Sequence, residues 1–269
     1  MLSSKNTSKK GLHYYLQGEA KPKVIFIHGL FGSGRNWHGY LRYVYDQFSI
    51  PCCAPDLRGQ GDSVHFTSAG NIESLVEDVY HFISELDLPS KPIVIGHSLG
   101  AKIAIMLSAM YPQLLEKIMV IDTALHPINR EVFILLDWLK GLPTPIIERR
   151  EARLYFDEQT EDQRLRNFLL TNLVKKDNGY GWRLDLKGLH GVVESLTTVD
   201  LEPYWSKVQV PICLVRGSDS THLVAQEAER MCSLRDVDYV EIEKAEHWVH
   251  ADNPDSFKKC LDKFLVVPK

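Results

Sequence analysis

Short, almost continuously apolar runs recur along this chain, and they limit its possible folds more than any other feature. The run at 23–28 (KVIFIH) is followed by others at 49–54, 91–96, 117–121, 210–216 and 237–242. Strands that are apolar at nearly every position, and not only at alternate ones, are typical of a parallel sheet covered on both faces. These runs therefore predict a mainly parallel central sheet.

Helical patterns lie between several of these runs. Residues 71–86 and 99–111 each place apolar side chains at the spacing of one helix face. Strands and helices that alternate in this way are the pattern of the α/β class, in which helices flank both faces of the sheet.

The alternation is interrupted once. From about 126 to 206 the patterns are helical only, and strand-like runs resume at Val210. We therefore predict an α/β core formed by residues 10–125 and 207–269, with a helical cap inserted at 126–206.

Composition excludes several classes of protein. The 269 residues carry a net charge of −4, from 31 basic and 35 acidic side chains spread along the chain, so we expect no nucleic-acid partner. No apolar run reaches the roughly 18 residues of a membrane span, so we expect no stable membrane insertion. A small neutral or mildly polar substrate fits best, and nothing in the sequence indicates an oligomeric state.

The cysteines and histidines give little support for a metal site. Five cysteines form no C-x-x-C pair and eleven histidines no H-E-x-x-H. We predict free thiols, no metal and no cofactor. The first ten residues, MLSSKNTSKK, lack the apolar segment of a secretory signal. Their Ser and Lys content without acids is a faint sign of organelle import, and we expect an intracellular protein.

A G-x-S-x-G pattern, Gly96-His97-Ser98-Leu99-Gly100, joins the third apolar run to the following helix. A serine on such a tight strand-to-helix turn is held in an unfavourable backbone conformation, with its hydroxyl clear of the sheet. The alternative is a helix N-cap serine, which is common in βα loops. The context favours Ser98 as a nucleophile.

A serine nucleophile needs an imidazole as its base. His247 follows the last predicted strand and precedes a C-terminal helix, which is where this fold can bring a histidine to the serine. His250 is the competitor, and we rank it lower because it adjoins the helix start. The pair could share a helix face, but two histidines without a third ligand are a weak basis for metal binding.

The imidazole in turn needs a carboxylate to hold its second nitrogen. Asp122 ends the fourth run and Asp219 follows the fifth, so both would lie at the carboxyl edge of the sheet. Spacing alone does not choose between them.

An oxyanion needs two backbone N–H donors. One is the N–H of Leu99, next to the nucleophile. The other should come from the turn after the first run, HGLFGSGRNW, from Leu30 or Phe31. The later DLRGQGDS turn is interpreted as structural, without a chemical role.

Together these motifs resemble the α/β-hydrolase superfamily, from about Leu12 to Leu265. HGLFGS, DLRGQGDS, GHSLG, KIMVID and AEHWVHADNP are similar to one branch, which contains bacterial YbfF-type esterases, mitochondrial abhydrolase relatives and yeast ethanol acetyltransferases. FLLTNLVKKDNGYGWRLDL, with Trp182 and Arg183, resembles the stretch that follows their cap helices.

The resemblance implies a serine hydrolase with Ser98 as nucleophile and His247 as base. In that branch the acid follows the strand after the nucleophile helix, which favours Asp122. The sequence departs from the branch by carrying Asp219 where many other α/β-hydrolases place their acid. Ser220 is a candidate accessory residue beside the histidine.

We therefore expect hydrolysis of short- to medium-chain carboxylic esters or thioesters, with an acyl ester or acyl-CoA as the small-molecule partner. One alternative is an alcohol O-acyltransferase that uses acetyl-CoA through the same acyl-enzyme. Another is a binding protein that keeps the fold without catalysis. The resemblance favours a mitochondrial location, and a cytoplasmic one stays open.

Overall fold

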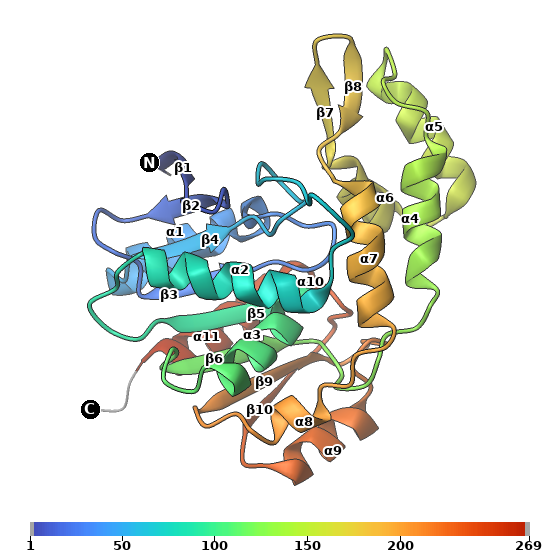
Figure 1. Ribbon diagram of the computed structural model, residues 1–269. Helices are drawn as coiled ribbons and strands as arrows, with labels where there is room; N and C mark the ends of the chain where they lie inside the picture. The colour runs from blue at the N-terminus through green and yellow to red at the C-terminus, as the bar shows by residue number, and fades with distance from the viewer. Residues whose placement is uncertain (1–2, 267–269) are drawn as a thin grey trace.

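The computed structural model describes residues 3–266, and its centre is an eight-stranded sheet (Figure 1). The strand order is β1-β2-β4-β3-β5-β6-β9-β10. β1 and β2 run antiparallel to their neighbours, and all pairs from β4 to β10 are parallel. The strands are β1 (Ser3–Thr7), β2 (His13–Gln17), β3 (Val24–Ile27), β4 (Cys52–Pro55), β5 (Ile93–His97), β6 (Lys117–Ile121), β9 (Ile212–Gly217) and β10 (Asp238–Ile242).

Helices cover both faces of the sheet, as predicted. Successive side chains of each strand point to opposite faces, so a buried strand contributes to a hydrophobic cluster on each side. Ile25 and Ile27 of β3 pack in the hydrophobic cluster that includes α2 and α3. Val24 and Phe26 pack in a second cluster with α1 and α11. The core helices are α1 (His38–Phe48), α2 (Ile72–Glu85), α3 (Leu99–Met110), α8 (Glu202–Trp205), α9 (Ala225–Leu234), α10 (Val249–Asp252) and α11 (Pro254–Leu265), with a short 3-10 helix, η1 (Gly34–Trp37).

The sheet begins before residue 10, where we placed the start of the core. β1 lies within the first ten residues, the segment that we considered as a targeting signal. Met1 and Leu2 of that segment lie outside the described residues. Its residues, SSKNT, are polar because it is an edge strand with one neighbour, so it lacks the apolar run of a buried strand.

We call residues 126–206 the cap segment; this division of the chain stays a prediction. Most of the segment stands beside the carboxyl edge of the sheet (Figure 1). It contains α4 (Val132–Gly141), α5 (Arg149–Gln159), α6 (Gln163–Leu170), β7 (Leu173–Lys176), β8 (Gly179–Trp182) and α7 (Leu186–Leu196).

The expectation that this segment is helical only is wrong. β7 and β8 pair as an antiparallel hairpin in which Lys176 lies opposite Gly179. Asp177 and Asn178 form the two-residue loop, and Gly179 after them has φ 134°, which favours glycine. Two glycines within a four-residue strand hid the hairpin from an analysis of apolar runs.

No helix within residues 3–266 is long and apolar enough to cross a membrane. All five cysteines are free thiols, as predicted, and four of them are buried.

Candidate active site

Ser98 occupies a strained turn between β5 and α3. Its φ of 52° and ψ of −114° lie in a region that side chains other than glycine rarely adopt. The two flanking glycines make the turn possible. A Cβ on Gly96 would overlap the backbone of Gly100, and one on Gly100 would overlap the carbonyl of Ile27. The strand, the helix and the turn therefore have the arrangement that the G-x-S-x-G pattern predicts.

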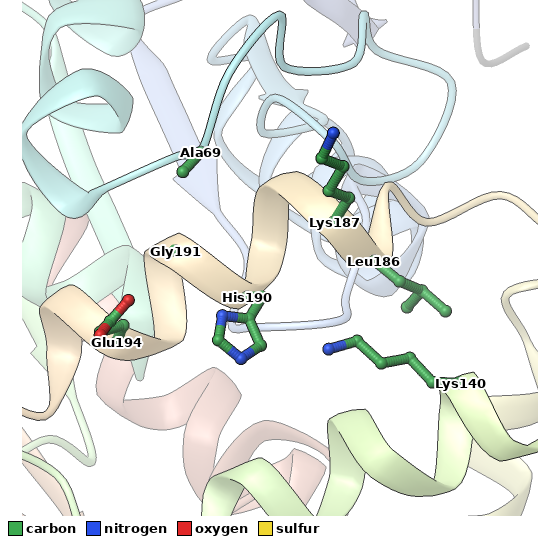
Figure 2. A pocket seen from close by; sticks show the side chains of 7 residues that line it. All are labelled: Ala69, Lys140, Leu186, Lys187, His190, Gly191 and Glu194. Carbon is green, nitrogen blue, oxygen red and sulfur yellow. The ribbon is translucent and has the colours of Figure 1, made fainter.

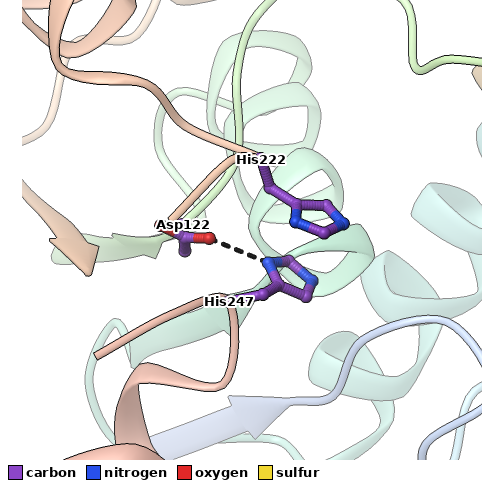
Figure 3. Close-up of side chains that lie close together, drawn as sticks. All are labelled: Asp122, His222 and His247. Atoms are coloured by element: carbon purple, nitrogen blue, oxygen red, sulfur yellow. Dashed lines mark hydrogen bonds and ion pairs between the residues drawn. The ribbon is translucent and has the colours of Figure 1, made fainter. Parts of the chain in front are cut away.

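Asp122 and His247 lie in hydrogen-bond contact at the same edge of the sheet (Figure 3). His247 Nδ1 is 2.8 Å from Asp122 Oδ2. Asp122 directly follows β6, is fully buried and has φ 50°. Its carboxylate also accepts hydrogen bonds from the Ser220 hydroxyl (2.6 Å) and the Gly217 N–H (3.3 Å). Ser220 and His247 thus share Asp122 Oδ2 as their hydrogen-bond acceptor, and the accessory role of Ser220 stays a prediction.

Spacing in the sequence could not choose between Asp122 and Asp219, but their positions in the structure distinguish them. Asp219 is exposed, and its carboxylate accepts a hydrogen bond from the neighbouring Ser218 hydroxyl at 2.9 Å. Only Asp122 of the two makes a hydrogen bond to His247 within residues 3–266. The arrangement therefore favours Asp122 as the orienting acid.

His250 lies behind this site. Its ring stacks on Trp37 with 4.6 Å between ring centroids, and its carbonyl accepts a hydrogen bond from the Tyr40 hydroxyl. The side chain is 9% exposed and makes no contact with Asp122 among the described interactions. It packs in the core near the helix start, as the lower ranking anticipated.

The protonation of this pair suits a general base. Burial lowers the pKa of His247 well below its ordinary value, and the charges of His222 and His250 act in the same direction. Burial raises the pKa of Asp122 to about 6, against the opposing effect of its hydrogen bonds from Ser220 and Gly217. At neutral pH the imidazole is therefore neutral and able to accept a proton.

His97 connects the serine turn to the histidine loop. Its ring lies 4.6 Å from the His247 ring between centroids, and its Nε2 donates to the His247 carbonyl oxygen at 2.8 Å. Because His97 directly precedes Ser98, this bond holds the two loops together. Ser98 is partly exposed, and within residues 3–266 no hydrogen bond joins its hydroxyl to His247, the expected base.

The expected oxyanion donors belong to the helix that follows this serine and to the turn that packs against it. Leu99 begins α3, so its N–H has no partner within the helix. The preceding turn packs directly against the nucleophile, since a Cβ on Gly29 would lie 3.3 Å from Ser98 Cβ. Phe31 in that turn is buried and has φ 60°. Within the described part of the chain, the N–H groups of Leu30 and Phe31 donate to no protein group.

His222 is a neighbour of the site that the sequence did not reveal. Its ring stacks on His247 with centroids 3.7 Å apart and an interplanar angle of 18° (Figure 3). The signal available was its position two residues after Ser220, in the loop after β9.

Asp122, His222 and His247 offer donor atoms within 4.8 Å of one another. The chemistry of these donors fits a hydrogen-bond network better than a cation site. Both Asp122 oxygens already accept hydrogen bonds, and Oδ2 accepts two. Stacked imidazoles also direct their in-plane lone pairs side by side instead of toward one shared point. The expectation of no metal stays a prediction.

A separate surface groove of about 440 Å³ lies between α7 and α4 (Figure 2). None of the candidate catalytic residues lines it. Its walls are Ala69, Lys140, Leu186, Lys187, His190, Gly191 and Glu194.

Known proteins of one family are similar to this chain in sequence and in architecture. The profile of the family described as alpha/beta hydrolase fold matches residues 22–254. The sn-1-specific diacylglycerol lipase ABHD11 of Danio rerio is 28% identical, over 93% of this chain and 80% of its own length. A Haemophilus influenzae protein named as an esterase/lipase is 30% identical, over 94% of this chain and 86% of its own.

Two further similarities bear on chemistry. A Saccharomyces cerevisiae protein named as an alcohol acetyltransferase is 29% identical, over 93% of this chain and 78% of its own. The solved structure of a marine microorganism esterase superposes with a TM-score of 0.84 at 27% identity and covers 96% of this chain and 100% of its own.

Proposed function

The chain belongs to the α/β-hydrolase family, and from this we propose that it is a serine hydrolase that cleaves carboxylic esters or thioesters of short to medium acyl chains. The observation that carries the proposal is the bond between His247 Nδ1 and Asp122 Oδ2, beside a serine on a strained turn. We assign Ser98 as nucleophile, His247 as general base and Asp122 as the acid that orients it.

The chemistry takes place in two halves. Ser98 Oγ attacks the acyl carbon and its proton passes to His247 Nε2, while Asp122 stabilises the imidazolium through Nδ1–H. N–H groups of Leu99 and of Leu30 or Phe31 bind the oxyanion. The leaving alcohol or thiol takes the proton from His247. Water then gives a proton to His247 and attacks the acyl-enzyme, which releases the acid and restores the Ser98 hydroxyl.

The relatives support an acyl substrate that is a small molecule. One is named for a diacylglycerol and another as an esterase/lipase. We propose an acyl ester or acyl-CoA as the partner of this chain and leave chain length to measurement.

Alcohol O-acyl transfer is the second candidate, favoured by the similarity to a protein named as an alcohol acetyltransferase. The acyl-enzyme would be the same, with an alcohol in place of water in the second half. Incubation with acetyl-CoA and ethanol separates the two: ethyl acetate indicates transfer, and acetate alone indicates hydrolysis.

The test of the function is Ser98→Ala. We expect hydrolysis of p-nitrophenyl butyrate to fall by at least about 10³-fold, and labelling by a fluorophosphonate probe to disappear. Ser84→Ala, an exposed serine on α2, is the matched control and should keep both properties. Full activity in Ser98→Ala would overturn the proposal. A folded wild type that neither hydrolyses esters nor reacts with the probe would favour the non-catalytic alternative.

Location and domain boundaries complete the proposal. We propose an intracellular protein, mitochondrial or cytoplasmic, on the basis of the resemblance described above. Subcellular fractionation tests the location. Limited proteolysis, with cuts expected near 126 and 206, tests the division between core and cap segment.

A further inference from the structure

Asn172 joins the cap segment to the candidate oxyanion turn. It lies between α6 and β7, and only 1% of its surface is exposed. Its Nδ2 donates a hydrogen bond to the carbonyl oxygen of Phe31 at 2.8 Å, although the two residues are 141 positions apart in the chain. None of the proposed catalytic steps involves this side chain directly.

Phe31 is a residue that needs such a contact. Its positive φ of 60° is unfavourable for a bulky side chain and persists only where the surroundings hold it. Its ring is 2% exposed, which fixes the position of Cα and Cβ. Its carbonyl is buried with Asn172 as the partner. A buried carbonyl without a partner is costly, so loss of this bond would favour rotation of the peptide away from the observed conformation.

Peptide planarity transmits the effect to the N–H groups. Each peptide unit is rigid, so the Asn172 bond to the Phe31 carbonyl, together with the bond from the Gly32 N–H to the Gly29 carbonyl at 3.0 Å, fixes the plane between residues 31 and 32. With Cα held by the buried ring and φ held near 60°, the plane before Phe31 is fixed as well. That plane carries the Phe31 N–H, one of the two expected oxyanion donors in this turn.

Asn172 is itself firmly held. Its backbone N–H donates to the Leu169 carbonyl at 3.1 Å, and its carbonyl accepts from the Arg183 N–H at 2.9 Å. These bonds anchor it between the end of α6 and the residue that follows β8. The backbone of Asn172 is therefore fixed, and this limits the movement of its side-chain amide relative to the Phe31 carbonyl.

We infer that Asn172 is a positioning residue for oxyanion stabilisation: the cap segment supplies the hydrogen bond that keeps the turn at residues 29–32 in its active conformation. The inference deepens the proposed function and rests on it. The cap segment then contributes to the stability of the transition state, and not only to the shape of the substrate site.

The test compares Asn172→Asp with Asn167→Asp. The first replaces the donor by an acceptor of the same shape, which repels the Phe31 carbonyl. The second introduces the same charge at an exposed position of α6 and is the matched control. For Asn172→Asp we expect kcat on p-nitrophenyl butyrate to fall by about 10- to 100-fold, with KM within about 2-fold of wild type. Asn167→Asp should match wild type.

A transition-state analogue separates positioning from a general structural effect. The affinity for a trifluoromethyl ketone, which forms an oxyanion on Ser98, should fall in proportion to kcat/KM. Asn172→Gln keeps an amide donor and should recover part of the loss, and Asn172→Ala provides a neutral variant if the aspartate prevents folding.

The possible outcomes separate the two proposals. If hydrolysis by wild type depends on Ser98 but folded Asn172 variants keep wild-type kcat, the inference is wrong and the proposed function stands. Lower kcat with unchanged affinity for the ketone also overturns it, since the oxyanion site would then be intact. If Ser98→Ala keeps full activity, the proposed function itself fails.

Discussion

The sheet edge and the cap segment contribute to the candidate site through different kinds of interaction. At the sheet edge the positions depend on backbone conformation, because Phe31, Ser98 and Asp122 all have positive φ angles in tightly packed turns. The cap segment reaches the same edge through side chains, with Asn172 bonded to the oxyanion turn and Arg164 paired with Glu246 and Asp252 around the histidine loop.

This difference predicts two classes of response to mutation. A backbone turn that is held by close packing either forms or does not, so changes there should act on folding. A side-chain bond can be lost while the fold stays, so changes in the cap segment should have little effect on stability even where they lower a rate. The predictions below test this contrast.

The largest effect is expected for Gly96→Ala. The new Cβ would overlap the carbonyl oxygen of Gly100, which is backbone and cannot move aside, so the turn at Ser98 could not close. We expect the free energy of unfolding to fall by more than about 4 kcal/mol. Urea unfolding followed by circular dichroism measures this change.

Gly39→Ala is the control for that experiment. Gly39 lies in α1 with no atom within 4 Å of the position of a Cβ, and alanine favours a helix. Its stability should stay within about 1 kcal/mol of wild type. Equal effects of the two substitutions would contradict the dependence of the serine turn on close backbone packing.

An intermediate effect is expected from acid. Burial lowers the pKa values of His97, His247 and His250 well below the ordinary 6.5. The unfolded chain therefore takes up protons below about pH 6.5 that the folded chain does not. The stability that these residues contribute is complete above that pH and is lost toward the lower pKa values of the folded state. Asp122, whose pKa is raised, changes the stability in the opposite direction, but it is one group against three histidines.

Unfolding in urea at pH 7.5 and pH 5.5 should give a smaller free energy at the lower pH. His250→Phe, which keeps an aromatic ring on Trp37, should reduce the difference and leave ester hydrolysis intact. A variant with the same pH dependence as wild type would show that His250 is not part of the effect. Loss of hydrolysis would instead point to a role for His250 in the reaction.

The smallest effect is expected for Arg164→Gln in the cap segment. Arg164 pairs with Asp252 at 2.6 Å and with Glu246, but half of its side chain is exposed, so water and salt screen both pairs. We expect a loss of stability below about 1 kcal/mol, smaller still in 0.5 M NaCl. Thermal unfolding at low and high salt checks this, and a loss that grows with salt would contradict it.

Most of the core could be predicted because its strands are buried on both faces. β3 is apolar throughout, and β5, β6 and β9 each contain a run of at least three apolar residues, so their sequences are distinctive. The edge strand β1 and the cap hairpin were missed because polar residues and glycines dominate them. β2 was missed as well, because buried and half-buried positions alternate along it and it forms no continuous apolar run. A strand that is stabilised mainly by a neighbouring strand leaves no apolar run to detect.

The candidate site was predictable in its residue types but not in its contacts. Ser98 and His247 follow from local motifs. The choice between Asp122 and Asp219 depends on where two loops meet, since both aspartates follow sheet strands. Asn172 and His222 were missed for the same reason, because each acts on a residue far away in the chain.

The distance in sequence between Asp122 and His247 has a consequence for synthesis of the protein. The two residues are 125 positions apart, and β10 and the loop after it must be in place before they can meet. A nascent chain on the ribosome therefore exposes Ser98 long before it receives its base. With the roles proposed here, a chain that ends before His247 carries the Ser98 hydroxyl without a base, so it is expected to have no hydrolase activity.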